Sequence, residues 1–446
     1  MKKTKIVLLG GGSGYFEYAV AEIATEPELE SIEFMFYDID EKRMDVMCRI
    51  GKRIVEKAKK NYSVKMTRDL AEALDGADYA ISSIGVHGPN AAWHLMDVNA
   101  CVPFGIIHTT GDTVGPAGLS QGLRLIPRIL EIAKAMEKYC PDAIILNHSN
   151  PMAPICRAIN KYTSIKVIGY CHNIYGDIFS FAKILEVSPK DLDVTVGGVN
   201  HCGWLLGIRH KGTDVYPELK KRLASATIPP EKLFAYEVFQ LTGLYPIGGS
   251  RHLLEFFPHG RTLDKTTDMP YAQKWRGGMI KEGMVQAELN KGHQELDLKA
   301  AGKKDVWMAQ EQTPEAMGKQ IKSLLKGPSS IHYVNIPNRG SIPNLPDWAV
   351  VEVKSLVGQH NAVPVYTGEL PPQAARWALA QIYAHELTVE AAVEKSRSKA
   401  IMALASDPLI RDFKEAGTVF DALVKAQGER LRDFRVKNVK QRNFNI

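Results

Sequence analysis

Four short polar motifs carry the residue types in this chain that are able to do chemistry. A thiolate and an imidazole together form a partial coordination shell for Mn²⁺, Fe²⁺, Co²⁺, Ni²⁺ or Zn²⁺, and they leave positions open for substrate oxygens. Cys171 and His201 offer such a pair, with His172 as an alternative nitrogen ligand. The four motifs are Thr110-Gly111-Asp112-Thr113 with Gly115-Pro116-Ala117-Gly118, Asn147-His148-Ser149-Asn150-Pro151, Cys171-His172-Asn173 and Asn200-His201-Cys202.

Each motif alone also has a purely structural interpretation. An Asn-Pro pair commonly forms a turn or starts a helix, and a single buried Cys commonly fills a core. All four motifs, however, follow predicted strands, and open α/β sheets bind their ligands at the carboxyl ends of strands. Their joint placement therefore favours a functional site over four unrelated turns.

A fifth motif, a glycine-rich turn near the N-terminus, predicts dinucleotide binding. Glycines directly after a strand let backbone N–H groups approach a pyrophosphate at the start of the next helix. Gly10 and Gly12 occupy the first two glycine positions of the GxGxxG fingerprint, with Gly11 and Ser13 in the same turn, and Tyr15 replaces the third glycine. Asp38, at the end of the second predicted strand, is placed to bind the ribose of NAD and to disfavour the 2′-phosphate of NADP.

Alternating strands and helices position these motifs in the first half of the chain. This alternation predicts βαβ units and a parallel sheet. The pattern changes near Asp191, so we expect a dinucleotide-binding domain over residues 1–192 and a second domain over residues 193–446. The predicted strands are Lys5–Leu9, Ile32–Tyr37, Ser63–Thr67, Tyr79–Ile84, Ala143–Leu146, Ile165–Tyr170, Val194–Val199 and Trp204–Arg209, and the long predicted helices are Gly118–Lys138, Met279–Asn290 and Pro371–Met402.

Composition excludes several other classes of protein. The net charge of +6 over 446 residues comes from scattered basic residues that interleave with acidic ones, so we expect no nucleic-acid partner. Six irregularly spaced cysteines do not form a disulfide framework. No stretch approaches the roughly 20 apolar residues that cross a bilayer, so we expect no membrane association and a cytoplasmic location.

The order of the motifs resembles the family 4 glycoside hydrolases over nearly the whole chain. The resemblance rests on Gly10 to Ser13, Gly111 to Gly118, Asn147 to Pro151, Cys171-His172, Gly198 to His201, Val334 to Gly340 and Val350 to Val353. It implies a Rossmann-like parallel sheet followed by a C-terminal α+β domain, as in lactate and malate dehydrogenases. It also implies a homodimer or homotetramer that acts on a small-molecule glycoside.

The resemblance implies a mechanism that needs both NAD and a divalent metal, with Mn²⁺ as the expected ion. Most glycosidases hydrolyse their substrates with a pair of carboxylates, whereas this family depends on NAD instead. NAD⁺ removes a hydride from C3 of the sugar, the ketone acidifies the C2 proton, and a metal held by Cys171 and His201 stabilises the charge that forms when a base removes this proton. The leaving group at C1 departs, water adds and the hydride returns.

The family pattern also implies which residues contact the substrate. Asn150 and Asn200 are expected to contact the sugar. Branches that act on phosphorylated sugars place an Arg where this chain has His94, which favours a non-phosphorylated sugar. The chain is most similar to the α-galacturonidase branch, so an α-linked hexuronide is expected, and Arg251 is a candidate to pair with its carboxylate.

The position of the catalytic base departs from the family. Ser250 stands where members carry Asp or Tyr, and Tyr245, His252 or a metal-bound hydroxide are the alternatives. His172 is a candidate proton donor to the leaving group, or else a ligand or supporting histidine. Two other functions compete: a 2-hydroxy-acid dehydrogenase, which would accumulate NADH, and a non-catalytic NAD-binding regulator, which would exchange no C2 proton with D₂O.

Overall fold

The computed structural model describes residues 3–85, 92–229, 232–257, 284–310, 316–359 and 361–436. For residue 250 and residues 284–289 it describes the backbone alone. The predicted helix Met279–Asn290 therefore lies partly outside the described residues.

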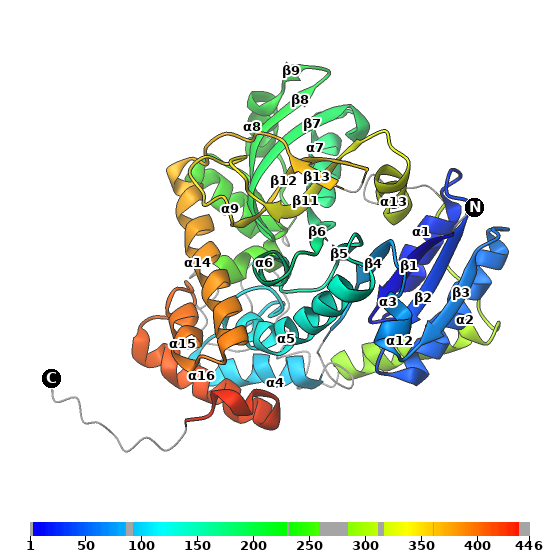
Figure 1. Cartoon of the computed structure of the whole chain (residues 1–446). Coiled ribbons are helices and arrows are strands. Elements are labelled where there is room, and N and C mark those ends of the chain that lie inside the picture. Colours follow the sequence, from blue (N-terminus) through cyan, green and yellow to red (C-terminus); the bar gives the residue numbers. More distant parts are fainter. Residues whose placement is uncertain are drawn as a thin grey trace.

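A nine-stranded sheet forms the centre of the molecule, in the order β13-β12-β11-β6-β5-β4-β1-β2-β3. Its six N-terminal strands are all parallel, while β11 to β13 are antiparallel and extend the sheet beyond β6 (Figure 1). The strands are β1 (Thr4–Leu9), β2 (Ile32–Tyr37), β3 (Ser63–Thr67), β4 (Tyr79–Ser82), β5 (Ile144–Asn147), β6 (Lys166–Tyr170), β11 (Ser330–Pro337), β12 (Val350–Gly358) and β13 (Asn361–Pro364). The parallel sheet is thus confirmed.

Alternation of side chains along the buried strands produces a core on each face of this sheet. In β1, Ile6 and Leu8 join one apolar cluster and Val7 and Leu9 join the other, because successive side chains point to opposite faces. Both faces are covered by helices, and such doubly covered parallel strands are apolar throughout rather than alternating with polar residues.

Helices cover the two faces and build the C-terminal part of the molecule (Figure 1). They are α1 (Tyr15–Thr25), α2 (Glu41–Lys57), α3 (Leu70–Leu74), α4 (Ala92–Cys101), α5 (Gly115–Tyr139), α6 (Met152–Tyr162), α7 (Asn173–Leu185), α8 (Tyr216–Ser225), α9 (Leu233–Thr242), α10 (Ser250–Leu253), α12 (Met284–Ala300), α13 (Met317–Leu325), α14 (Pro372–Glu394), α15 (Arg397–Ala405) and α16 (Phe413–Gln427). Short 3₁₀ turns are η2 (Val102–Phe104), η3 (Pro189–Asp191), η5 (Leu254–Phe256) and η8 (Gly428–Phe434). Among the described helices, none is long and apolar enough to span a bilayer.

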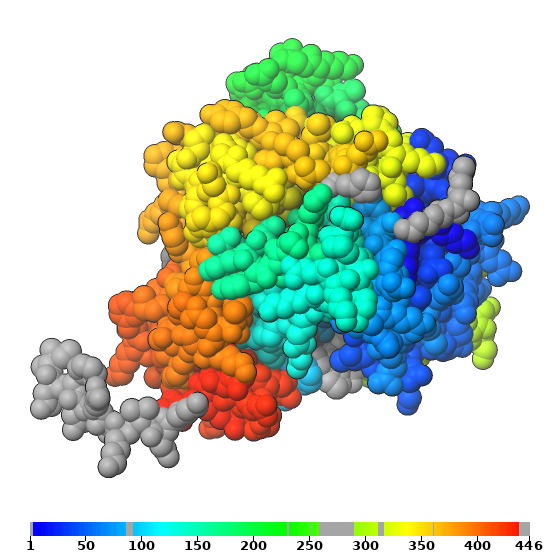
Figure 2. Space-filling model, in the orientation of Figure 1, coloured from blue at the N-terminus to red at the C-terminus, as the bar shows by residue number. Residues whose placement is uncertain are grey.

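A second, smaller sheet begins where the sequence pattern changes. It contains β7 (Leu192–Val199), β8 (Cys202–His210), β9 (Thr213–Asp214) and β10 (Pro246–Ile247), all paired antiparallel. In Figure 1 and Figure 2 the green part of the chain around β8 and β9 projects from one end of the molecule, next to a yellow part of the chain. Because β11 to β13 belong to the first sheet, residues from both halves of the chain share it, and a division at residue 192 stays a prediction.

The long helix expected over Pro371–Met402 is two helices. α14 ends at Glu394, and Lys395 adopts a left-handed φ of 55°. The side chain of Ser396 then accepts the N–H of Lys399 and so caps α15. A left-handed residue followed by a capping serine ends one helix and begins the next, although the apolar spacing continues across the break.

Candidate active site

Parallel register brings the sequence motifs to one edge of the central sheet. Leu9 pairs with Ser82, Ser82 with Asn147, and Asn147 with Gly169, so β1, β4, β5 and β6 end side by side. The glycine turn, the Asn147 motif and the Cys171 motif follow directly from these ends. The Asn147 and Cys171 motifs therefore lie at the expected edge. The prediction that every motif follows a strand is wrong for the Thr110 motif, which follows α4 and η2, and the Asn200 motif follows β7 of the second sheet.

The glycine turn has the geometry of a dinucleotide cradle. Gly10 has a φ of +80°, and a Cβ there would lie 2.6 Å from the carbonyl oxygen of Ser83, so only glycine fits this close approach. Asp38 accepts the N–H of Gly12 at 2.8 Å, which places its carboxylate beside the turn. α1 starts directly afterwards, and its N-cap Gly14 contributes no side-chain cap. A bare helix N-terminus beside an anchored carboxylate fits a pyrophosphate and a ribose.

Tyr15, in the position of the third fingerprint glycine, connects this turn to the end of β5. Its hydroxyl lies 3.1 Å from the imidazole of His148, and that ring stacks on Tyr170 at 5.7 Å between centroids. Burial lowers the pKa of His148 to about 3, so the ring is neutral at pH 7. These two contacts connect the strand that ends before Cys171 to the glycine turn. No sequence pattern indicated them.

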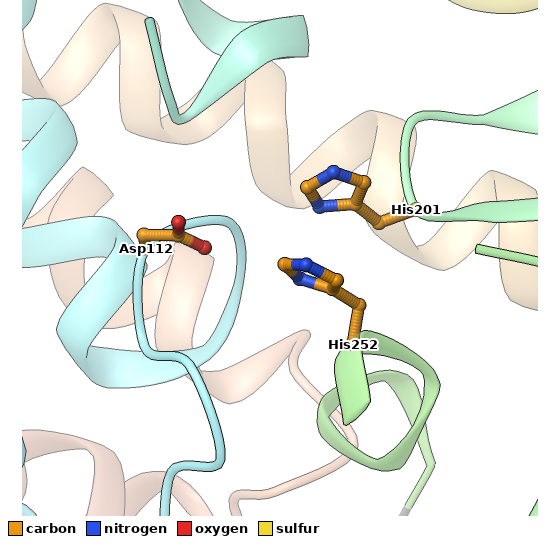
Figure 3. Close-up of side chains that lie close together, drawn as sticks. All are labelled: Asp112, His201 and His252. Atoms are coloured by element: carbon orange, nitrogen blue, oxygen red, sulfur yellow. The ribbon is translucent and has the colours of Figure 1, made fainter. Parts of the chain in front are cut away.

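Three side chains from distant segments meet beyond this edge. Asp112, His201 and His252 each offer a ligand atom, and these atoms lie within 4.8 Å of one another (Figure 3). The two imidazole rings face each other with centroids 3.8 Å apart, and the Asp112 carboxylate points toward both. Two imidazoles and one carboxylate suit Mn²⁺ and related ions. We call these three residues the Asp112 cluster.

Local geometry explains how the three segments approach so closely. His201 occupies the two-residue turn between β7 and β8 with a φ of 65°. Gly248 passes directly over it, and a Cβ at Gly248 would lie 2.1 Å from the His201 carbonyl oxygen. The glycine therefore lets the chain reach α10 and deliver His252 against His201.

Protonation states in the Asp112 cluster suit coordination of a cation. Burial and the neighbouring His252 lower the pKa of His201 well below its usual value. Burial also lowers the pKa of His252. Burial opposes ionisation of Asp112, but the two imidazoles and the Thr113 hydroxyl outweigh it and lower its pKa. The cluster thus contains neutral rings and an ionised carboxylate at pH 7, which are the states that bind metals.

Cys171 lies in the same region but is not one of the three residues of the Asp112 cluster. Its sulfur receives hydrogen bonds from the backbone N–H of Asn173 and the side chain of Asn200, while burial and the charge of Glu352 raise the pKa of the thiol. The Asn200 amide also donates to Glu352 at 3.1 Å. Burial raises the pKa of Glu352 to about 7. Coordination by Cys171 requires loss of the thiol proton, which a bound cation promotes.

Buried amide oxygens around the cluster have no hydrogen-bond partner in the described part of the chain. These are Asn150 Oδ1, Asn200 Oδ1 and Gln121 Oε1. Their nitrogens are occupied, since Asn150 donates to Asp112 at 3.2 Å and Gln121 to the Asn150 carbonyl at 2.8 Å. Because buried acceptors are rarely left unpaired, these oxygens fit donors supplied by a ligand, such as sugar hydroxyls.

The remaining predicted site residues occupy different environments. His172 is exposed. It lies close enough to His148, His201 and His252 to contribute to the lowering of the pKa of each of these imidazoles. Arg251 is also exposed, and its Nε donates to the Thr109 carbonyl at 3.1 Å.

Tyr245 and His94 are buried away from solvent. The ring of Tyr245 packs against Phe181 and Phe239. His94 is 3% exposed and its Nε2 lies 2.8 Å from the Thr110 carbonyl, so it supports the loop that carries Asp112. Ser250 begins α10, but its side chain lies outside the described residues.

One buried carboxylate joins the loop that carries Asp112 to the short helical segment that carries His252. Glu255 Oε1 accepts the N–H groups of Thr110 at 2.9 Å and Gly111 at 2.8 Å, and it pairs with His108 Nδ1 at 3.1 Å. Burial disfavours a charged His108, but hydrogen bonds to Cys101 and Glu255 outweigh it and raise its pKa to about 10. Sequence reasoning missed Glu255, and its place three residues after His252 was the one available signal.

Comparisons with known proteins agree on one family. The family model described as "Family 4 glycosyl hydrolase" matches residues 5–187, and the family model of the C-terminal domain matches residues 196–410. The boundary between the two matches falls at residues 188–195.

Relatives with assigned names match over nearly their full lengths. An α-galactosidase of Bacillus subtilis is 28% identical, over 97% of this chain and 100% of its own. An α-galacturonidase of Thermoanaerobacterium saccharolyticum is 28% identical, over 97% of each chain. A crystal structure of a 6-phospho-α-glucosidase from gut microorganisms, in complex with NAD and glucose-6-phosphate, is 25% identical with a TM-score of 0.77, over 96% of this chain and 98% of its own.

Proposed function

The chain belongs to family 4 of the glycosyl hydrolases, and on that premise we propose that it cleaves an α-linked, non-phosphorylated glycoside with bound NAD and a divalent cation. A galacturonide is the first candidate substrate. The observation that carries the proposal is the placement of the glycine turn and the Asp112 cluster beyond the same edge of the sheet.

The residues present fit both groups. Gly10 to Ser13 and Asp38 would hold NAD, because the turn admits no side chain and the carboxylate is anchored beside it. His201 would bind the cation, with Cys171, Asp112 and His252 as the further ligand candidates. When bound, NAD supplies a hydride acceptor and donor, and the cation supplies positive charge beside an ionising substrate oxygen.

Protein side chains would accept the C2 proton and donate a proton to the leaving group. In the arrangement in which His252 does not bind the cation, it is our candidate to take up the C2 proton, because its Nδ1 is buried and has no partner in the described part of the chain. Tyr245, the alternative base, lies in an aromatic cluster. The exposed imidazole of His172 would donate a proton to the leaving group.

Polar groups around the cluster would orient the sugar. The free amide oxygens of Asn150 and Asn200 would accept hydrogen bonds from its hydroxyls. Arg251, held at Nε by Thr109, would pair with a substrate carboxylate through its outer nitrogens.

Residue 94 supports a non-phosphorylated substrate. His94 stands where branches for phosphorylated sugars are expected to place an Arg, and it lies buried beneath the Thr110 loop. Relatives that match along nearly the whole chain are named α-galactosidase and α-galacturonidase, but one is named a probable 6-phospho-β-glucosidase, so the proposal rests on His94 rather than on these names.

A panel of 4-nitrophenyl glycosides tests the proposal, assayed with Mn²⁺, NAD⁺ and a reductant. It should include α-galacturonide, α-galactoside and 6-phospho-α-glucoside. We expect kcat/KM for the α-galacturonide to exceed that for the 6-phosphate by at least about a hundredfold, without net accumulation of NADH. A preference for the 6-phosphate would refute the substrate assignment, and accumulation of NADH would indicate a dehydrogenase.

A further inference from the structure

Thr113 makes a contact with His201 that none of the proposed roles uses. The residue is 4% exposed and directly follows Asp112. Its hydroxyl donates to Asp112 Oδ1 at 2.8 Å and lies 2.9 Å from His201 Nδ1. Asp112, Thr113 and His201 therefore form a continuous hydrogen-bonded chain.

A single hydroxyl hydrogen sets the direction of this chain. The Thr113 hydroxyl has one hydrogen, and it donates this hydrogen to Asp112 Oδ1. The other oxygen of Asp112 already accepts the Asn150 amide at 3.2 Å. Toward His201, the hydroxyl then presents only an oxygen lone pair, and a favourable contact requires that Nδ1 carries a hydrogen.

We propose that Thr113 is a positioning residue that holds His201 as the Nδ1–H tautomer and so leaves the Nε2 lone pair for the cation. The identity of that cation rests on the proposed function, while the tautomer does not. A histidine ligand depends in this way on the partner of its other ring nitrogen, which fixes both the tautomer and the orientation of the ring. Asp112 thereby acts on His201 through Thr113.

The backbone on both sides of Thr113 is anchored, so its hydroxyl has a defined position. On one side, Glu255 accepts the N–H groups of Thr110 and Gly111. On the other, Asp407 accepts the N–H of Gly115 at 3.0 Å. The opposing ring is constrained as well, because His201 lies in a tight turn against His252.

Two substitutions and one control test the inference. Thr113→Val keeps the shape and removes the hydroxyl, and Thr113→Ser keeps the hydroxyl. Thr388→Val is the matched control, since Thr388 is similarly buried and its hydroxyl donates to the Ala384 carbonyl on α14. The readouts are the tautomer of His201 in long-range ¹H–¹⁵N spectra of metal-free protein, assigned with His201→Gln, and the Kd for Mn²⁺ from isothermal titration.

We expect the wild type to show the Nδ1–H tautomer and Thr113→Val to lose it, with a Kd for Mn²⁺ that is about 10- to 100-fold higher. Thr113→Ser should restore both, and Thr388→Val should change neither. An Nε2–H tautomer in the wild type, or an unchanged tautomer and Kd in Thr113→Val, would overturn the inference. Failure of every glycoside as a substrate, with the Thr113-dependent tautomer present, would refute the proposed function and leave the inference standing.

Discussion

The glycine turn and the Asp112 cluster lie beyond the same edge of the central sheet but are built in opposite ways. The turn comes from one stretch of chain, and backbone groups and the Asp38 carboxylate hold it. The cluster comes from three segments far apart in the sequence, and buried side chains such as Glu255 hold them together. On the proposed assignment, dinucleotide binding depends on local backbone conformation, whereas cation binding depends on how distant segments pack.

The glycine turn and the Asp112 cluster also differ in their burial and electrostatics. Asp38 and Ser13 are half-buried beside the turn, with access to water. In the cluster, burial lowers the pKa values of both histidines, and the partner carboxylates Glu255 and Asp407 are almost completely buried. Buried polar groups that lose a partner destabilise a fold strongly, so substitutions around the cluster should affect packing as well as chemistry.

The largest expected effect separates the two regions by function. His201→Ala should abolish Mn²⁺ binding and lower kcat by about a thousandfold or more, because it removes a ligand from the site of charge development. NAD binding, followed by titration calorimetry, should stay within about twofold of wild type. His210→Ala, at the far end of the strand that follows His201, is the control and should behave as wild type. Retained Mn²⁺ binding in His201→Ala would place the cation elsewhere.

A substitution in the glycine turn should weaken NAD binding without changing Mn²⁺ binding. Gly10→Ala introduces a Cβ 2.6 Å from the Ser83 carbonyl oxygen at a left-handed φ, so NAD affinity should fall by about a hundredfold. Mn²⁺ binding to NAD-free protein should be unchanged. Gly76→Ala is a matched control, because Gly76 also has a positive φ of 64° but no atom lies within 4 Å of the place that a Cβ would take. Equal losses of NAD affinity in both variants would show that backbone strain, not the cradle, matters.

A smaller effect should follow from loosening the support of the cluster. Glu255→Gln removes the charge opposite His108 and should weaken Mn²⁺ binding about tenfold, as substitutions behind metal ligands typically do. Asp97→Asn is the control, since Asp97 is fully buried and pairs with Arg124 at 2.7 Å without contacting the cluster. Both variants should lose stability to urea, but only Glu255→Gln should change the Kd for Mn²⁺.

The smallest effect concerns pH and the carboxylate that anchors Gly115. Burial raises the pKa of Asp407 to about 6, above the value of about 3.9 in an unfolded chain. Between these two pH values the folded state binds more protons than the unfolded state. The contribution of Asp407 to the free energy of unfolding therefore decreases from about pH 4 to about pH 6 and is constant above about pH 6. The decrease should be at most about 3 kcal/mol.

Urea denaturation of wild type and Asp407→Asn at pH 4.5 and pH 7 measures this contribution. From pH 4.5 to pH 7, the unfolding free energy of the wild type should fall relative to that of the variant, because the neutral amide of the variant binds no proton in this range. Identical pH dependence in both proteins would show that Asp407 is not protonated in this range.

The sequence predicted the local features well and the long-range ones only in part. The strands Ile32–Tyr37 and Ser63–Thr67 have the predicted bounds. The first is a mostly apolar run, and the second alternates Val64 and Met66 with polar residues, which is the period of a strand. The break between α14 and α15 was missed, since a left-handed lysine is not visible in apolar spacing. Strands β11 and β12 were recognised only as family motifs, although they extend the parallel sheet.

The same limit applies to the site. Motif order placed Cys171 beside the correct sheet edge, because β5 and β6 are parallel and end together. Asp112 follows α4 and η2, and His201 lies in the turn between β7 and β8 of the second sheet, so parallel strand order did not place these two residues. Nothing in the sequence indicated that His252 packs against His201, that Thr113 forms a hydrogen bond with His201, or that Glu255 accepts the N–H of Thr110. These contacts depend on the fold of segments about 50 to 150 residues apart, whose meeting no local pattern encodes. The roles of the individual residues and the oligomeric state stay predictions.

Anomalous diffraction at the manganese edge, from crystals of the protein with Mn²⁺ and NAD, tests the central claim most directly. We predict one anomalous peak within coordination distance of His201 Nε2 and of at least one of Cys171, Asp112 and His252, with the dinucleotide lying along Gly10 to Ser13. A peak bound to other residues, or a dinucleotide away from this turn, would contradict the proposed site.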